Sequence, residues 1–142
     1  MASLDLTSAR RDHLAQKLKN HGLRTTMPRL QLADLLFAKG NRHLTADMLY
    51  AEARAAGLSV SQATIYNTLN QFSEAGLLRE VQVDKTRSYY DTNLDAHHHF
   101  YVVKDGLLID IERDAVALAK TPQTPDGFCV TGVDIVIRLE SK

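Results

Sequence analysis

Residues 61–76 read SQATIYNTLNQFSEAG, and this stretch decides the fold. Ser61 can cap a helix at its start, and Gly76 can end it. Between them apolar residues recur at helical spacing, at Ile65, Leu69 and Phe72. The opposite face carries amide and phenol side chains but no acid, which is unusual for a helix face that meets only water.

Three more helices are expected before this one. Each candidate has a capping residue or an early proline, apolar residues at helical spacing, and a glycine at its end. The first extends from the cap Ser8 to Gly22, the second from the region of Pro28 to Gly40, and the third from the cap Thr45 to Gly57.

After Gly76 the apolar period changes from 3.6 residues to 2. Residues 78–83 and 87–91 are expected to be strands joined by a turn at Asp84-Lys85-Thr86. Helix, short turn, helix and β-hairpin is the order of a winged helix-turn-helix. The sequence therefore predicts a winged-helix DNA-binding domain over residues 1–92.

The chain then changes character, with a hinge expected at residues 93–96. The remainder, residues 97–142, predicts a β-β-α-β unit. Its strands are expected at 97–103, 107–111 and 133–139, and its short helix at 112–120. A unit of this size is small to be stable alone, and pairing with a second copy is the usual remedy. The expected fold class is thus α+β, a winged helix-turn-helix followed by a small α/β dimerisation domain.

Charge and cysteine content narrow the class of protein. The 17 Lys and Arg balance 17 Asp and Glu, but the basic residues predominate before residue 92 and the acidic ones after it. No apolar run approaches the ~20 residues that a membrane span requires. The single cysteine, Cys129, excludes an intrachain disulfide and fits a reducing cytoplasm.

The outer face of the helix at 61–76 suits base edges in a major groove. Basic residues before the second helix and on the hairpin could hold phosphates. The residues expected to contact DNA are Arg24, Arg29, Gln62, Thr64, Tyr66, Asn67, Lys85 and Arg87. The alternative is a small helical bundle whose uncharged face binds another protein.

Three consecutive histidines carry the most conspicuous chemistry. On a strand, His97 and His99 share a face and can converge on one ion, while His98 points the other way. Imidazole suits Zn, Fe, Ni or Cu, and carboxylates raise the preference for Fe(II) and Mn(II). The residues that could complete such a site are Asp91, Asp110 and His43. The alternative is an exposed polar start to the strand.

Several motifs, in matching order, resemble the ferric uptake regulator (Fur) family. They are LRTTMPR at 23–29, HLTADMLY at 43–50, ATIYNTL at 63–69 and the histidines at 97–99, and the resemblance covers nearly the whole chain. Within the family the chain is most similar to the iron response regulator (Irr) branch of alphaproteobacteria. The stretches that indicate this branch are LFAKG at 36–40, YNTL at 66–69, HHHF at 97–100 and VDIVIRL at 133–139.

The resemblance implies a homodimer that binds a double-stranded DNA operator through the helix bearing Tyr66, with Arg29 as a backbone contact. It also implies a regulatory site for Fe, Mn or Zn between the two domains. That site maps onto His43, Asp91, His97, His99 and Asp110 if one residue is deleted within 92–96. Without the deletion, His98 and Phe100 take two ligand positions and the site is broken. The first register is preferred because it also aligns Gly106 and Asp110.

The chain departs from the family pattern at three places. It lacks the paired CxxC motifs that hold a structural zinc in most members, so no Cys-based zinc site is expected. Ala96 and Ala117 stand where a second metal site would need ligands. The Cys-Pro motif through which some Irr proteins bind haem is also missing. Haem would therefore have to use His97, His98 and His99, with His98 as the candidate axial ligand.

The resemblance implies a regulator of iron and haem homeostasis that is active on DNA at low iron and is inactivated by haem. Two alternatives lie within the family. One is a repressor activated by divalent Fe, Mn or Zn. The other is a peroxide sensor that is switched when bound iron causes oxidation of His43 or His97. A small metalloenzyme is the alternative class, but the chain has no nucleophile motif and no phosphate loop, so we expect no enzymatic activity.

Overall fold

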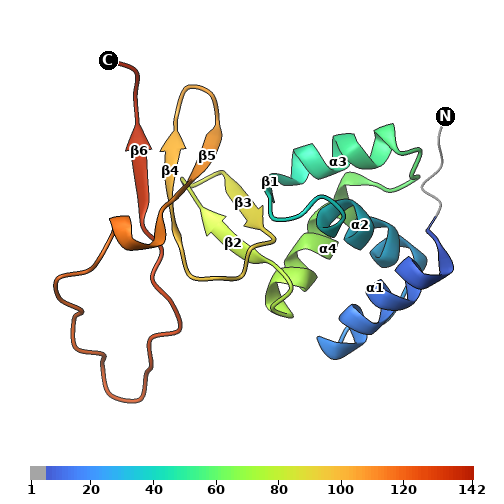
Figure 1. Ribbon diagram of the computed structural model, residues 1–142, viewed down its shortest axis with the longest axis horizontal. Helices are drawn as coiled ribbons and strands as arrows, with labels where there is room; N and C mark the ends of the chain where they lie inside the picture. Colours follow the sequence, from blue (N-terminus) through green and yellow to red (C-terminus); the bar gives the residue numbers. More distant parts are fainter. Residues whose placement is uncertain (1–5) are drawn as a thin grey trace. The chain divides into compact units, whose positions relative to one another are not determined.

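The computed structural model describes residues 6–142 and divides them into two compact units, each built on a three-stranded sheet (Figure 1). The first unit extends to Leu94 and the second from Asp95 to Lys142. The first five residues of the predicted DNA-binding domain lie outside the described part of the chain.

The first unit contains the four predicted helices. They are α1 (Ser8–Asn20), α2 (Met27–Phe37), α3 (Ala46–Ala55) and α4 (Gln62–Glu74). Each follows a Thr or Ser whose hydroxyl accepts a hydrogen bond from a backbone N–H in the first turn. The cap of α1 is Thr7, so the prediction of Ser8 as the cap was wrong by one residue. Thr7 precedes the first helical residue in extended conformation, as a cap must.

One apolar core holds the helices of the first unit together. The inward face of α4 is fully buried, with Ile65, Leu69 and Phe72 all at 0% exposure. They pack in one cluster with Leu14 and Leu18 of α1 and with buried residues of α2 and α3. The apolar spacing that predicted α4 is therefore the spacing that fastens it to the bundle, and its outer face stays in solvent.

The sheet of the first unit has the order β1-β3-β2, with antiparallel pairing throughout. Its strands are β1 (His43–Leu44), β2 (Arg79–Gln82) and β3 (Ser88–Asp91). β2 and β3 form the predicted hairpin. β1 was not predicted, because two residues are too few to show a period.

Arg42 anchors β1 to its surroundings. Its guanidinium donates two hydrogen bonds to the Glu52 carboxylate of α3, at 2.9 and 2.5 Å, and one to the Leu35 carbonyl of α2 at 3.3 Å. Hydrogen bonding to Glu52 raises the pKa of Arg42 above its ordinary value. Its backbone N–H and carbonyl each bond to Thr92, both at 2.9 Å. Arg42 therefore ties the end of β3 to two helices.

The second unit is a sheet of order β5-β4-β6, built from β4 (His98–Val102), β5 (Leu107–Ile111) and β6 (Val136–Leu139). β4 and β5 form an antiparallel hairpin, and β6 lies parallel to β4. The α+β class is confirmed, with the winged helix first and a small unit that has the three predicted strands second. The last strand begins at Val136, three residues later than predicted.

The helix predicted at 112–120 is not formed. Only a 3-10 turn, Arg113–Ala115, follows β5, and Val116 is already extended. Glu112 gives no side-chain cap, and nine residues without a packed face cannot offset the cost of helix nucleation. Figure 1 shows the chain between this turn and β6 as a long irregular loop.

Replacing Leu69 tests the packing of α4. We expect Leu69→Ala to lower the free energy of unfolding by about 2–5 kcal/mol, because it opens a cavity at a fully buried site. Asn67→Ala on the exposed face of the same helix should change it by less than ~0.5 kcal/mol. Urea unfolding followed by circular dichroism measures both. Equal effects of the two substitutions would contradict the assignment of faces.

Candidate functional site

The exposed face of α4 presents polar side chains that are not engaged elsewhere. Tyr66 is 48% exposed. Within residues 6–142, the side chains of Gln62, Tyr66 and Asn67 have no hydrogen-bond partner. Thr64 is different, since its hydroxyl lies 3.0 Å from that of Ser61 at the helix cap. This face is therefore ready to bond to an external partner.

Arg29 joins the start of α2 to α4. Its guanidinium donates to the carbonyl of Arg24 at 2.9 Å and to the side-chain oxygen of Gln71 on α4 at 2.7 Å. Arg24, Arg29, Asn67 and Gln71 line one hollow of about 360 Å³ between the two helices. The fork of Arg29 is thus held beside the exposed face of α4. Gln71 was not predicted, because its bond to Arg29 depends on this contact between helices.

The hairpin turn is closed by an acid. Asp84 accepts hydrogen bonds from the backbone N–H groups of Thr86 and Arg87, both at 2.8 Å. These bonds, that from Thr86 first, lower the pKa of Asp84. Lys85 is exposed at the tip of the turn, and Arg87 follows it. The two basic residues predicted to hold phosphates thus lie on a turn of defined geometry.

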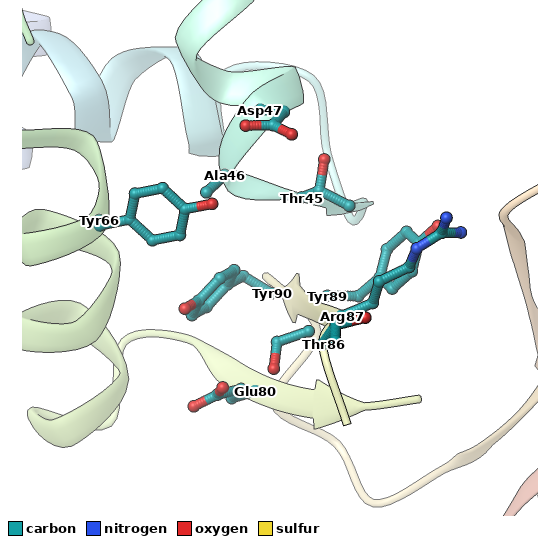
Figure 2. Close-up of a pocket in the computed structure, with 10 residues that line it drawn as sticks. Thr45, Ala46, Asp47, Tyr66, Glu80, Thr86, Arg87, Tyr89 and Tyr90 are labelled. Carbon is teal, nitrogen blue, oxygen red and sulfur yellow. The ribbon is translucent and has the colours of Figure 1, made fainter. Parts of the chain in front are cut away.

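A second hollow, of about 490 Å³, lies beside Tyr66 between α4, the start of α3 and the sheet (Figure 2). Tyr90 of β3 points across it and donates from its phenol to the Asn70 side-chain oxygen of α4 at 3.1 Å. Burial first, then Glu80 and Tyr66, raise the pKa of Tyr90, so its phenol keeps its proton. Asp47, Glu80 and Arg87 also line the hollow, so its lining carries charges of both signs.

In the second unit, two histidines converge on one carboxylate. The Nε2 atoms of His97 and His99 lie 3.4 and 3.2 Å from one oxygen of Asp110. The two rings are 4.5 Å apart, and His99 is only 2% exposed. The Nδ1 of His97 lies 2.5 Å from the Asp95 carbonyl oxygen, which can only accept a hydrogen bond. That bond puts the proton of the neutral ring on Nδ1, so Nε2 carries the lone pair through which an imidazole binds a metal ion.

His98 does not belong to this cluster. Its Nδ1 accepts a hydrogen bond from the backbone N–H of Ile135 at 3.1 Å. An imidazole that accepts at Nδ1 carries its proton on Nε2 when neutral. The Nε2 of His98 therefore has no lone pair to offer, which weighs against this residue as an axial ligand of haem.

The first unit holds the other two predicted ligands. His43 of β1 and Asp91 of β3 are directly opposite each other in the antiparallel pair, so their side chains share a face. Asp91 is 1% exposed, and its carboxylate accepts from the backbone N–H of Asn93 at 2.9 Å. Of the five predicted ligands, two are neighbours in the first unit and three are gathered in the second.

Comparison with known proteins shows the family to which the chain belongs. The ferric uptake regulator family matches residues 20–137. The chain belongs to this family. The ferric uptake regulation protein of Shigella flexneri is 32% identical over 100 residues, 70% of this chain and 68% of that protein. That of Bordetella parapertussis is 36% identical over 87 residues, 61% of this chain and 62% of that protein.

Solved structures of the family share the fold. The ferric uptake regulator of Pseudomonas aeruginosa superimposes with a TM-score of 0.69 at 25% identity, covering 91% of this chain and 98% of that one. For the Vibrio cholerae regulator the TM-score is 0.70 at 23% identity, over 89% and 98% of the two chains. The family that the motifs resemble is thereby confirmed.

Ferric uptake regulators are transcription regulators of metal uptake and not enzymes, in agreement with the expectation from the sequence. Among the helices of residues 6–142, none has the length and apolar character needed to cross a membrane.

The cluster at Asp110 predicts different effects for neighbouring histidines. His99→Ala should weaken Mn(II) or Zn(II) binding by at least ~100-fold, because removing a ligand costs more than removing an outer-shell partner. His98→Ala, the matched control, should bind the ion like the unchanged protein. Calorimetric titration of the two variants measures this. Equal loss in both would contradict the assignment of ligands.

Proposed function

We propose that this ferric uptake regulator homologue is a DNA-binding transcription regulator whose affinity for its operator is set by a divalent metal ion. One observation carries the proposal, the convergence of the His97 and His99 Nε2 atoms on the carboxylate of Asp110. Within residues 6–142, His97, His99 and Asp110 are all members of a group whose ligand atoms lie within 4.8 Å of one another. Two buried imidazoles and a carboxylate suit Fe(II), Mn(II) or Zn(II).

His97, His99 and Asp110 would hold the ion, and His43 and Asp91 would complete its shell. The bound ion would supply positive charge that balances the acids and fixes the ligands relative to one another. The P. aeruginosa homologue has been solved with manganese. Mn(II) is therefore the first ion to test here.

The exposed face of α4 is proposed to read base edges in a major groove. Gln62, Thr64, Tyr66 and Asn67 would face the bases, with Arg24, Arg29, Lys85 and Arg87 on phosphates. Unengaged polar side chains on α4 and the held fork of Arg29 support this role. The V. cholerae homologue, which has the same fold, is known to have DNA-binding domains.

Metal and DNA binding would be coupled through residues 93–96, which we propose as the hinge. Only five residues separate Asp91 from His97 in the chain. An ion shared by ligands on both sides of this segment would restrict it, and so select one arrangement of the reading helices. Such coupling between two sites is worth ~1–3 kcal/mol in typical cases.

A homodimer is proposed because the second unit exposes an apolar sheet face. Phe100 pairs with Ile109 on β5 and with Ile137 on β6, so these three side chains share a face. Ile109 and Ile137 are each 39% exposed, and Leu107 is 51% exposed. A second copy of the chain would cover this face, and two reading helices would then match a pseudo-palindromic operator.

Haem is the alternative effector, suggested by the resemblance to the Irr branch. In that alternative the protein controls iron and haem homeostasis and leaves DNA when haem is present. The bond from Ile135 to His98 argues against His98 as the axial ligand, and His97 and His99 are buried. A peroxide sensor would use the same metal site, and would show added oxygen on His43 or His97 in mass spectra after peroxide treatment.

Removing the metal tests the function directly. We expect Mn(II) to raise the affinity of the full chain for a selected operator by roughly 5–150-fold, the range of a typical coupling energy. His99→Ala should lose the response, and His98→Ala should keep it. Gel-shift titrations after chelation, after adding Mn(II) and after adding haem measure these effects. Release by haem with no effect of Mn(II) would replace this proposal by the Irr alternative.

A charge on the apolar face tests the dimer. Ile109→Asp should dissociate it, because a carboxylate would be buried without a partner. Leu118→Asp is the control, since Leu118 is 49% exposed and lies outside the sheet. Sedimentation velocity of the two variants gives their mass in solution. A dimer that survives Ile109→Asp would show that another surface joins the copies.

A further inference from the structure

The hydrogen bond between Tyr90 and Asn70 has a consequence for base recognition. Asn70 lies one helical turn after Tyr66, so the two side chains occupy the same stripe of α4. Asn70 is exposed, but its side-chain oxygen already accepts the proton of the Tyr90 phenol at 3.1 Å. Its amide nitrogen has no partner within the described chain, residues 6–142.

The donor in this bond is fixed by the fold. Tyr90 is 4% exposed and belongs to the apolar core. It sits on the central strand, paired with Leu44 on one side and Glu80 on the other. Figure 2 shows its phenol directed from the sheet toward α4, with Tyr66 and Glu80 nearby. The raised pKa of Tyr90 keeps the phenol protonated, so the bond keeps its direction.

An asparagine held in this way is poorly placed for its usual contact. A free Asn side chain turns to pair with adenine through two bonds, accepting from N6 and donating to N7. Here the bond from Tyr90 takes one lone pair of the oxygen and fixes the plane of the amide, so the NH2 group is the end that has no partner and is directed to a base. In the major groove that group fits an acceptor, and meets repulsion from the amino groups of adenine and cytosine.

We infer that Asn70 is a specificity-determining residue that reads keto bases, guanine or thymine, and that Tyr90 is the positioning residue that sets this preference. Guanine offers O6 and N7 as acceptors, and thymine offers O4. This inference rests on the proposed role of α4 as the reading helix. It does not depend on which effector controls the protein.

The test removes one atom from the core. Full-length protein and its variants select DNA from a random duplex library, with and without Mn(II). The unchanged protein should enrich guanine or thymine at one position of each half-site. Tyr90→Phe frees the Asn70 amide to turn, so adenine should rise at that position by about tenfold relative to the keto bases. Tyr89→Phe, the matched control, deletes the same atom one residue earlier, on the other face of β3, and should leave the preference unchanged.

Asn70→Ala tests the same position without touching the core, and should abolish the preference there while sparing other positions. Thermal unfolding shows whether Tyr90→Phe is folded. If that variant does not fold, the result for Asn70→Ala alone decides the inference. The inference is overturned if Asn70→Ala alters no position, or if a folded Tyr90→Phe keeps the original preference. Selection of the same DNA with and without Mn(II) would remove the metal control but leave the base readout standing. If the unchanged protein enriches no sequence, α4 does not read DNA and the inference falls with that role.

Discussion

Strand β3 is paired on both sides, and the rest of the first unit depends on this constraint. β1 and β2 hold it through antiparallel hydrogen bonds, so its register is fixed at every residue. Successive side chains of a strand point to opposite faces. Tyr90 therefore points to α4 and Asp91 points away from it. One strand thus contacts α4, the proposed reading helix, with one residue and carries a candidate metal ligand with the next.

This arrangement needs β1 as much as β3. A strand of two residues has few hydrogen bonds of its own. Arg42, which precedes β1, holds the strand in place with hydrogen bonds to Glu52, Leu35 and Thr92. A displacement of the His43–Asp91 pair would therefore be transmitted to α2 and α3 through charged and backbone hydrogen bonds. α3 shares its core with α4, because Leu49 and Leu69 belong to the same buried cluster. The contacts from the candidate ligand residues His43 and Asp91 to α4 are therefore contiguous.

Sequence patterns predicted the parts of this fold that local chemistry determines. Capping hydroxyls, apolar spacing and glycine ends placed the four helices, and the change of period placed the hairpin. They could not foresee β1, whose two residues become a strand only because β3 offers a free edge. They also predicted a helix at 112–120 that is not formed. Its apolar residues suggested a helical period, but no other element covers them there. Local propensity decides an element only when packing or a cap supports it.

The site shows the same division. Strand parity predicted that His97 and His99 share a face apart from His98, and the structure brings the Nε2 atoms of both to one oxygen of Asp110; their joint binding of a metal ion stays a prediction. The pairing of His99 with Asp110 depends on the length of the turn between β4 and β5, which spacing alone does not fix. The bond from Tyr90 to Asn70 joins residues 20 apart in the chain and has no local signal at all. Contacts of this kind follow from register, which is a property of the assembled sheet.

The charge distribution explains why such fixed geometry matters for a DNA-binding protein. Phosphate neutralisation supplies most non-specific affinity, but this chain has no net charge, and Asp47 and Glu80 lie beside the reading helix. Few basic residues are available near α4 and the β2–β3 hairpin, among them Arg24, Arg29, Lys85 and Arg87. Under the proposed function, long-range attraction would come only from the modest excess of basic residues before residue 92, and binding would depend on how well the amides of α4 and the held fork of Arg29 fit their targets. Under the proposed function, a small change in the position of α4 would therefore weaken DNA binding more than it would in a strongly basic protein.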